Sequence, residues 1–314
     1  MATSLPIKTV RTTKAGRVKW NWKRNWVLYA CLLPSAAMLL IFSYSPMYGL
    51  QIAFKDFNPG LGFADSPWVG LSWFRFLFTL PNFQPVITNT VVIAVIKILL
   101  GQLVPITFAL LLNEARNTAF KKLVQTFVYL PHFLSWVIVG GLFLDLLSDD
   151  GLVNQLIRAL GMDSIPFLVS NDWFKFTLIS TDIWKGFGWG AILYLAALSG
   201  INPELYEAAV IDGAGRFQRV VHITLPGISS TIVLLAALSL GGILNAGFDQ
   251  VLILYNPAVY SSGDVLDTFI FRQGLTEMQF SLATAVGLMK SVIGFGLILL
   301  SNRLAYKLAN YRIF

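Results

Sequence analysis

The residues in this sequence that could do chemistry are polar side chains and tryptophans inside long apolar stretches. A charged group in hydrocarbon is costly, so such residues commonly face water or one another. Lys97 and Lys290 have no acid within a helical turn and could bind an anionic ligand or pair across helices, whereas Asp182 and Lys185 are spaced to neutralise each other on one helix face. We predict a substrate path, with tryptophan faces of the kind that stack on sugar rings, lined by Asn89, Lys97, Trp136, Asp182, Trp184, Lys185, Trp189, Asn245 and Lys290.

Catalytic groups are scarce by comparison. The histidines are His132 and His222, the single cysteine is Cys31, and no HExxH, GxSxG or CxxC motif occurs. Glycine pairs such as Gly186 with Gly188 lie in apolar runs and are typical of helix packing. No GxxxxGK[ST] motif is present, so any ATP would be bound by another chain. We expect no catalytic residue, no metal site and no cofactor in this chain.

The composition indicates an integral membrane protein. Of 314 residues, 56% are hydrophobic and only 12% are charged. The net charge of +7 informs topology rather than nucleic-acid binding, because no basic face is interleaved with aromatic residues outside the N-terminal tail. We predict an all-α fold with a basic tail over 1–25, a transmembrane domain over 26–304 and a second tail over 305–314. The six spans are expected at about 26–50, 86–112, 123–147, 176–199, 227–248 and 281–303.

The distribution of basic residues predicts the orientation. The two tails, the loops at 113–122 and 200–226 and the last residue of the sixth span, Arg303, together hold 15 of the 23 Lys and Arg residues, and the other loops hold five. The positive-inside rule therefore places both termini in the cytoplasm, with the first apolar run kept as a span because it is too long for a cleaved signal peptide. The outer loops carry acidic residues, and either a solvated face or a docking surface for another protein would explain them. In the first of these loops, closely spaced aromatic residues favour a segment lying at the membrane interface.

The stretch "EAAVIDGAGRFQRVVHITLP" (207–226) is the longest patch of mixed polarity in the second half of the chain. Asn202 can cap a helix that starts at Pro203, and Gly213 is placed to end it in a left-handed turn. The helix would have about ten residues, too few to span a membrane. A second short piece, about 215–223, is expected to end where Pro226 starts the fifth span. Either a simple connecting loop or a short helix that docks into another protein would fit these features.

The same stretch resembles the EAA loop of permease subunits of bacterial ATP-binding-cassette importers, through Glu207-Ala208-Ala209, Gly213 and Ile223-Thr-Leu225-Pro226. Further segments resemble the carbohydrate branch that handles oligosaccharides from polysaccharides such as alginate and rhamnogalacturonan: "PMYGLQIAFKDFNP", "SPWVGL", "YLPHFLSW", "FDQVLILYNPAVY", "VLDTFIFRQGL" and "ATAVGLMKSVIG". The likeness extends over nearly the whole chain from about residue 26.

This resemblance implies a type I importer permease in the bacterial cytoplasmic membrane, working by alternating access. Its implied partners are a second, different permease subunit, two ATPase subunits that bind ATP and Mg, an extracytoplasmic solute-binding protein and an oligosaccharide. The implied ATPase-coupling residues are Glu207, Ala208, Ala209, Asp212, Gly213, Ala214, Phe217, Ile223, Leu225 and Pro226. Lys97 and Lys290 would suit an acidic sugar unless they pair with acids such as Asp182. The alternative is an ion-coupled secondary transporter that uses Lys97, Asp182, Lys185 and Lys290.

Overall fold

The structure is a computed structural model that describes residues 22–309. Most of the expected tail over 1–25 and the last five residues of the expected tail over 305–314 lie outside these residues. The chain divides into two units, Met1–Leu50 and Gln51–Phe314. In the first, α1 (Trp22–Leu39) continues through a π-helical turn, η1 (Leu40–Tyr44), into the 3-10 segment η2 (Ser45–Phe54), which crosses the boundary between units.

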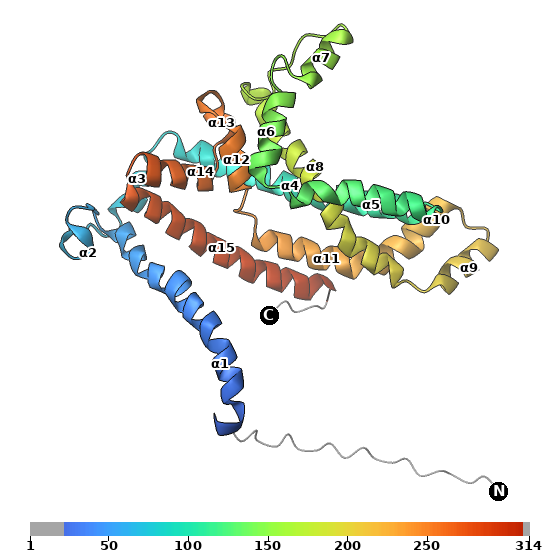
Figure 1. The fold of residues 1–314 in the computed structure, drawn as a ribbon, viewed down its shortest axis with the longest axis horizontal. Coiled ribbons are helices and arrows are strands. Elements are labelled where there is room, and N and C mark those ends of the chain that lie inside the picture. Colours follow the sequence, from blue (N-terminus) through green and yellow to red (C-terminus); the bar gives the residue numbers. More distant parts are fainter. Residues whose placement is uncertain (1–21, 310–314) are drawn as a thin grey trace. The chain divides into compact units, whose positions relative to one another are not determined.

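In the described part of the second unit the regular elements are helices (Figure 1). An isolated bridge joins Lys55 to Trp68. The long helices of this unit are α4 (Phe83–Glu114), α8 (Asn171–Ser199), α11 (Leu225–Gly241) and α15 (Phe280–Ala309). Shorter helices connect them: α2 (Gly62–Asp65), α3 (Ser72–Leu77), α5 (Thr118–Phe133), α6 (Trp136–Leu146), α7 (Leu152–Ala159), α9 (Pro203–Ile211) and α10 (Arg216–Arg219).

Helix α4 is the central element of this unit. Its first turn contributes Phe83 to an apolar cluster with α14 and α15, its middle contributes Ile93 to a cluster with α8 and α12, and its last turns contribute Ala109 to a cluster with α8 and α11. The sequence of α4 is apolar on all sides, as expected of a helix surrounded by protein and lipid. Because the neighbouring helices pack on α4, their positions around it decide which of their polar groups come close to one another.

Four helices of the described chain are long and apolar enough to cross a membrane, and a fifth span results if one bent pair is counted as a unit. The four are Trp26–Phe54, Phe83–Glu114, Arg216–Gly241 and Phe280–Arg303, which match the expected first, second, fifth and sixth spans. The expected fourth span lies in α8, which has 29 residues but carries charges in its middle. The count of six spans and the cytoplasmic termini remain predictions.

The expected third span, 123–147, is not one straight helix, and its place as a span stays a prediction. Helices α5 and α6 meet at 102°, with the bend at Leu134 and Ser135. Pro131 lies in the last turn of α5, Leu134 and Ser135 are extended, and the Ser135 side chain accepts a hydrogen bond from the Ile138 N–H to cap α6. A proline near the helix end and a capping serine together produce the break.

The expected fifth span, 227–248, also needs correction at its C-terminal end. Helix α11 stops at Gly241, and a non-helical segment over 242–247 precedes α12 (Phe248–Leu254). We call residues 242–247 the α11–α12 break. Gly241 and Gly242 are poor helix formers, and Gly247 adopts φ +97°, a conformation that favours glycine.

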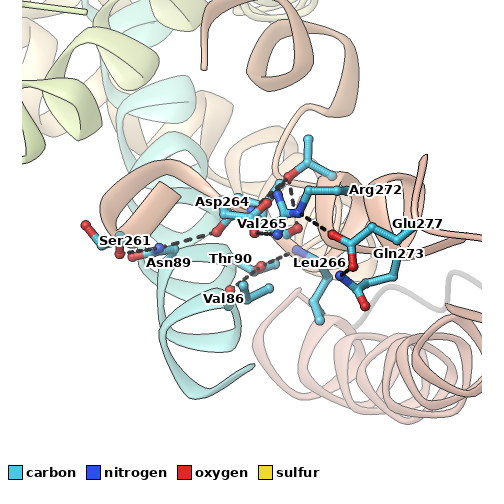
Figure 2. Close-up of polar contacts among 11 residues, drawn as sticks. Val86, Asn89, Thr90, Ser261, Asp264, Val265, Leu266, Arg272, Gln273 and Glu277 are labelled. Atoms are coloured by element: carbon cyan, nitrogen blue, oxygen red, sulfur yellow. Dashed lines mark hydrogen bonds and ion pairs between the residues drawn. The ribbon is translucent and has the colours of Figure 1, made fainter. Parts of the chain in front are cut away.

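The segment that follows, residues 257–276, is folded onto α4; we call it the outer segment after the face that the sequence predicts for it. It contains η4 (Pro257–Val259), α13 (Tyr260–Gly263), α14 (Leu266–Phe271) and a π-helical turn, η5 (Arg272–Thr276). Figure 2 shows Asn89 of α4 donating to the carbonyl oxygens of Ser261 and Asp264, at 2.9 and 3.3 Å, while Thr90 accepts from the Leu266 N–H. Two acids of this segment form ion pairs: buried Asp264 pairs with Arg272 (Figure 2), and Asp267 pairs with Lys290.

Candidate functional site

Helix α9 has the start that the sequence predicts. Pro203 occupies its first turn, and the Asn202 side chain accepts a hydrogen bond from the Glu204 N–H at 3.1 Å. Asn202 also donates to the Glu204 carboxylate. These bonds satisfy donors that the first turn leaves without partners, so this nine-residue helix is well defined although short.

The end of α9 is also as predicted. Gly213 lies at φ +79°, its N–H donates to the Val210 carbonyl at 3.1 Å, and the Ala214 N–H donates to the Ala209 carbonyl at 2.8 Å. This pair of bonds is a Schellman motif, which requires a left-handed residue at the position of Gly213. The chain direction after α9 is therefore fixed by backbone hydrogen bonds rather than left to a loose loop.

The prediction that a second piece ends before Pro226 is wrong. Residues Arg216–Gly241 form one 26-residue helical run in which α10, a π-helical turn, η3 (Val220–Thr224), and α11 are continuous. The Leu225 N–H donates to the Val220 carbonyl, and this wider turn lets the helix pass Pro226, which has no N–H. A contact between the hydroxyls of Tyr206 and Thr224, 3.0 Å apart, ties α9 to the same run.

The surface of this loop carries exposed apolar side chains and a pocket. Ile211 and Phe217 are 86% and 80% exposed. Beside them is a pocket of about 380 Å³ lined by Ala209, Asp212, Gly213, Ala214, Gln218, Arg219, His222 and Ile223. The predicted coupling residues Glu207, Ala208 and Pro226 are exposed, while Leu225 is half-buried.

The structure thus brings five predicted coupling residues around one pocket and adds Gln218, Arg219 and His222, which the sequence reasoning did not select. Ile211 was also missed. An isoleucine in an otherwise polar loop could have drawn attention to it, because a large apolar side chain exposed to water commonly marks a contact surface.

Lys97 is not free in the membrane-spanning part. Its ammonium donates to the Ala246 carbonyl at 2.8 Å and to the Gln250 side chain, and lies 3.5 Å from the Asp182 carboxylate. The predicted pairing of Asp182 with Lys185 is therefore wrong, because Asp182 faces α4 instead. The alternative prediction, that Lys97 pairs with an acid across the bundle, is confirmed.

Lys290 also has partners on other elements. Its ammonium donates to the Asp267 carboxylate and, at 2.9 Å, to the Asn245 side chain. Asn245 belongs to the α11–α12 break. The prediction that Lys290 must find a partner beyond its own helix is confirmed.

Lys185 has a different environment. Its ammonium donates to the His132 carbonyl at 3.0 Å and lies 5.5 Å from the centre of the Trp136 ring. The Trp189 ring stacks on His132 with centroids 4.5 Å apart. Within residues 22–309, Lys185 has no carboxylate within ion-pair distance. The bend between α5 and α6 thus brings together three predicted path residues, Trp136, Lys185 and Trp189, while Trp184 lies edge-on to Phe143.

A pocket of about 240 Å³ lies against the α11–α12 break. It is lined by Ala94, Lys97, Ile98, Gly101, Gln102, Asp182, Ser239, Gly242, Asn245, Ala246 and Gly247. Predicted path residues Lys97, Asp182 and Asn245 share this pocket, whereas Asn89 is 2% exposed and binds the outer segment. Gln102 and Ser239 were not predicted, since single uncharged polar residues in an apolar run are a weak signal.

Comparison with known proteins shows the family. Residues 101–310 match the family described as "Binding-protein-dependent transport system inner membrane component". Protein LplB of Bacillus subtilis (strain 168) is 46% identical over 286 residues, covering 91% of this chain and 90% of LplB. The polygalacturonan/rhamnogalacturonan transport system permease protein YteP of the same organism is 46% identical over 288 residues, with coverages of 91% and 90%.

Two solved structures are also similar. One is a bacterial ABC transporter involved in the import of the acidic polysaccharide alginate, with 42% identity, a TM-score of 0.84 and coverages of 91% and 97%. The other is a bacterial alginate ABC transporter in complex with an alginate pentasaccharide-bound periplasmic protein, with 41% identity, a TM-score of 0.85 and coverages of 93% and 98%. Nothing in these matches supports the ion-coupled alternative. The chain therefore belongs to the binding-protein-dependent transport system inner membrane component family and is a membrane permease subunit of the ABC importer type.

Proposed function

We propose that this chain forms half of the transmembrane path of an ATP-driven importer for acidic oligosaccharides. It would act in the bacterial cytoplasmic membrane with a second permease chain, two ATPase subunits that bind ATP and Mg, and an extracytoplasmic solute-binding protein. The observation that carries the proposal is the capped helix α9, joined through a Schellman turn to the long run Arg216–Gly241.

This arrangement can transmit force. An ATPase subunit that grips the exposed side chains of Ile211 and Phe217 would move α9, and the contact between Tyr206 and Thr224 would pass the movement to the long helix. The far end of that helix is the α11–α12 break, which lines the 240 Å³ pocket. Movement at the loop would therefore reach the wall of the path without passing through a flexible joint.

Lys185 is the side chain best placed to bind a substrate carboxylate. A lysine ammonium has three donors, and Lys185 uses one of them on the His132 carbonyl, whereas Lys97 and Lys290 each hold an acid. Trp136 and Trp189 add aromatic surface for sugar rings, and Trp189 is 46% exposed. The sugars named for the relatives, alginate and polygalacturonan, are polymers of acidic residues, which agrees with a cation at this position.

Two experiments test the proposal. Gentle purification of the chain from its own membranes should recover an ATPase and a second permease, and recovery of the chain alone would contradict the importer assignment. In the reconstituted complex, Lys185→Met should lower uptake of a uronate oligosaccharide about tenfold, by loss of a charge-assisted bond, and leave its carboxyl-reduced neutral form unaffected.

The matched control is Lys122→Met, which removes the same charge from an exposed position on α5 and should leave both uptake rates unchanged. An equal loss for the acidic and the neutral sugar would refute the role of Lys185 in charge recognition.

A further inference from the structure

The α11–α12 break is held from two sides by buried or half-buried lysines. Lys97 of α4 donates to the backbone carbonyl of Ala246, and Lys290 of α15 donates to the side chain of Asn245. Each ammonium also holds an acid on a further element, Asp182 of α8 for Lys97 and Asp267 of α14 for Lys290. Two independent cation pairs therefore converge on six residues of irregular backbone.

The Lys97 ammonium is surrounded by three protein partners. It donates hydrogen bonds to the Ala246 carbonyl and the Gln250 side chain and forms an ion pair with the Asp182 carboxylate at 3.5 Å. The lysine side chain is 9% exposed. A substrate carboxylate could bind Lys97 only by displacing one of these partners.

The network continues beyond the lysine. The Gln250 amide donates to the Leu178 carbonyl and to the Thr181 hydroxyl of α8, each at 2.7 Å. A β-carbon added at Gly247 would lie 3.0 Å from the Lys97 ammonium nitrogen, so the backbone of the break closely approaches the cation. The break is consequently fixed relative to α4 and α8, although it lies outside regular helix and has only turn-type backbone hydrogen bonds such as Asn245 N–H to the Gly242 carbonyl.

We infer that Lys97 and Lys290 are positioning residues that hold the α11–α12 break in place as the wall of the path, rather than cations that bind the substrate. Without the two lysines, the Ala246 carbonyl loses its hydrogen-bond donor, and Asp182 and Asp267 lose their ion-pair partners. The break then separates from α4 and α15. This inference rests on the proposed function only in treating the pocket as part of the path. The geometry of the break can be measured without transport.

The test uses thiol accessibility in the assembled complex. In a Cys31→Ser background, Ala246→Cys places the only thiol of this chain at a position that is 1% exposed. A soluble maleimide should label it slowly. Adding Lys97→Met should speed labelling about tenfold or more, since charge-assisted bonds that close the break are lost, and Lys290→Met should have the same direction of effect.

Lys185→Met is the matched control, because it removes an in-span ammonium that does not contact the break, and labelling should stay slow. Unchanged labelling in both the Lys97 and the Lys290 variants would overturn the inference. If the Lys97 variant does not assemble, the Lys290 variant, whose lysine is less buried, decides the question alone. Failure of the proposed function would appear differently, as the absence of an ATPase partner or of acidic-sugar selectivity at Lys185.

Discussion

The sharpest prediction concerns Gly213→Asp. Gly213 closes the Schellman turn at φ +79°, a left-handed conformation that costs L-residues about 1–2 kcal/mol, with Asp toward the lower end of that range. No atom lies within 4 Å of the β-carbon that would be added, so the cost comes from the backbone and from the new charge beside Asp212 rather than from a clash. A cost of this size lowers the population of the closed turn roughly 5- to 30-fold.

We therefore expect Gly213→Asp to abolish or at least sharply lower uptake while the protein stays in the membrane at its normal amount. The assay measures sugar uptake and ATP hydrolysis in the reconstituted complex, together with the amount of chain in the membrane. The matched control is Gly215→Asp, which introduces the same side chain two residues later at φ −66°, where L-residues are unstrained and aspartate can cap α10. Normal uptake by the Gly213 variant, or equal loss in both variants, would refute the role assigned to the turn.

Three further predictions follow from local geometry. Asn202→Ala removes the cap of α9 and should cost about 1 kcal/mol of helix stability, seen as less ATP hydrolysis coupled to uptake, whereas unchanged coupling would contradict it. Gly188→Ala would place a β-carbon 2.3 Å from a backbone carbonyl oxygen of α5 and should lower the thermal unfolding midpoint of the purified chain, while Gly186→Ala, with nothing within 4 Å, should not. Arg272→Met leaves Asp264 buried without its ion pair and should cost about 3 kcal/mol in the outer segment, measured by faster proteolysis there, so wild-type resistance would count against this pairing.

The sequence by itself determined the features that depend on neighbouring residues. Asn202, Pro203 and Gly213 each have a local conformational preference, so the limits of α9 could be predicted within a residue or two. Long apolar runs likewise predicted the helices around 86–112 and 281–303, because the cost of placing polar groups in lipid depends on composition alone. The family resemblance added the coupling role, which local physics left open.

The tertiary structure decided the partners of the charged groups. Asp182 pairs with Lys97, 85 positions away, rather than with Lys185 three positions away, because the orientation of α8 against α4 decides which acid meets which base. The sharp bend between α5 and α6 and the early end of α11 were missed for a related reason: hydropathy records where a segment can enter lipid but not where its backbone turns. Helix packing therefore decides that, of the three lysines inside the predicted spans, Lys97 and Lys290 pair with an acid and Lys185 does not. The spacing of residues along the chain could not reveal this.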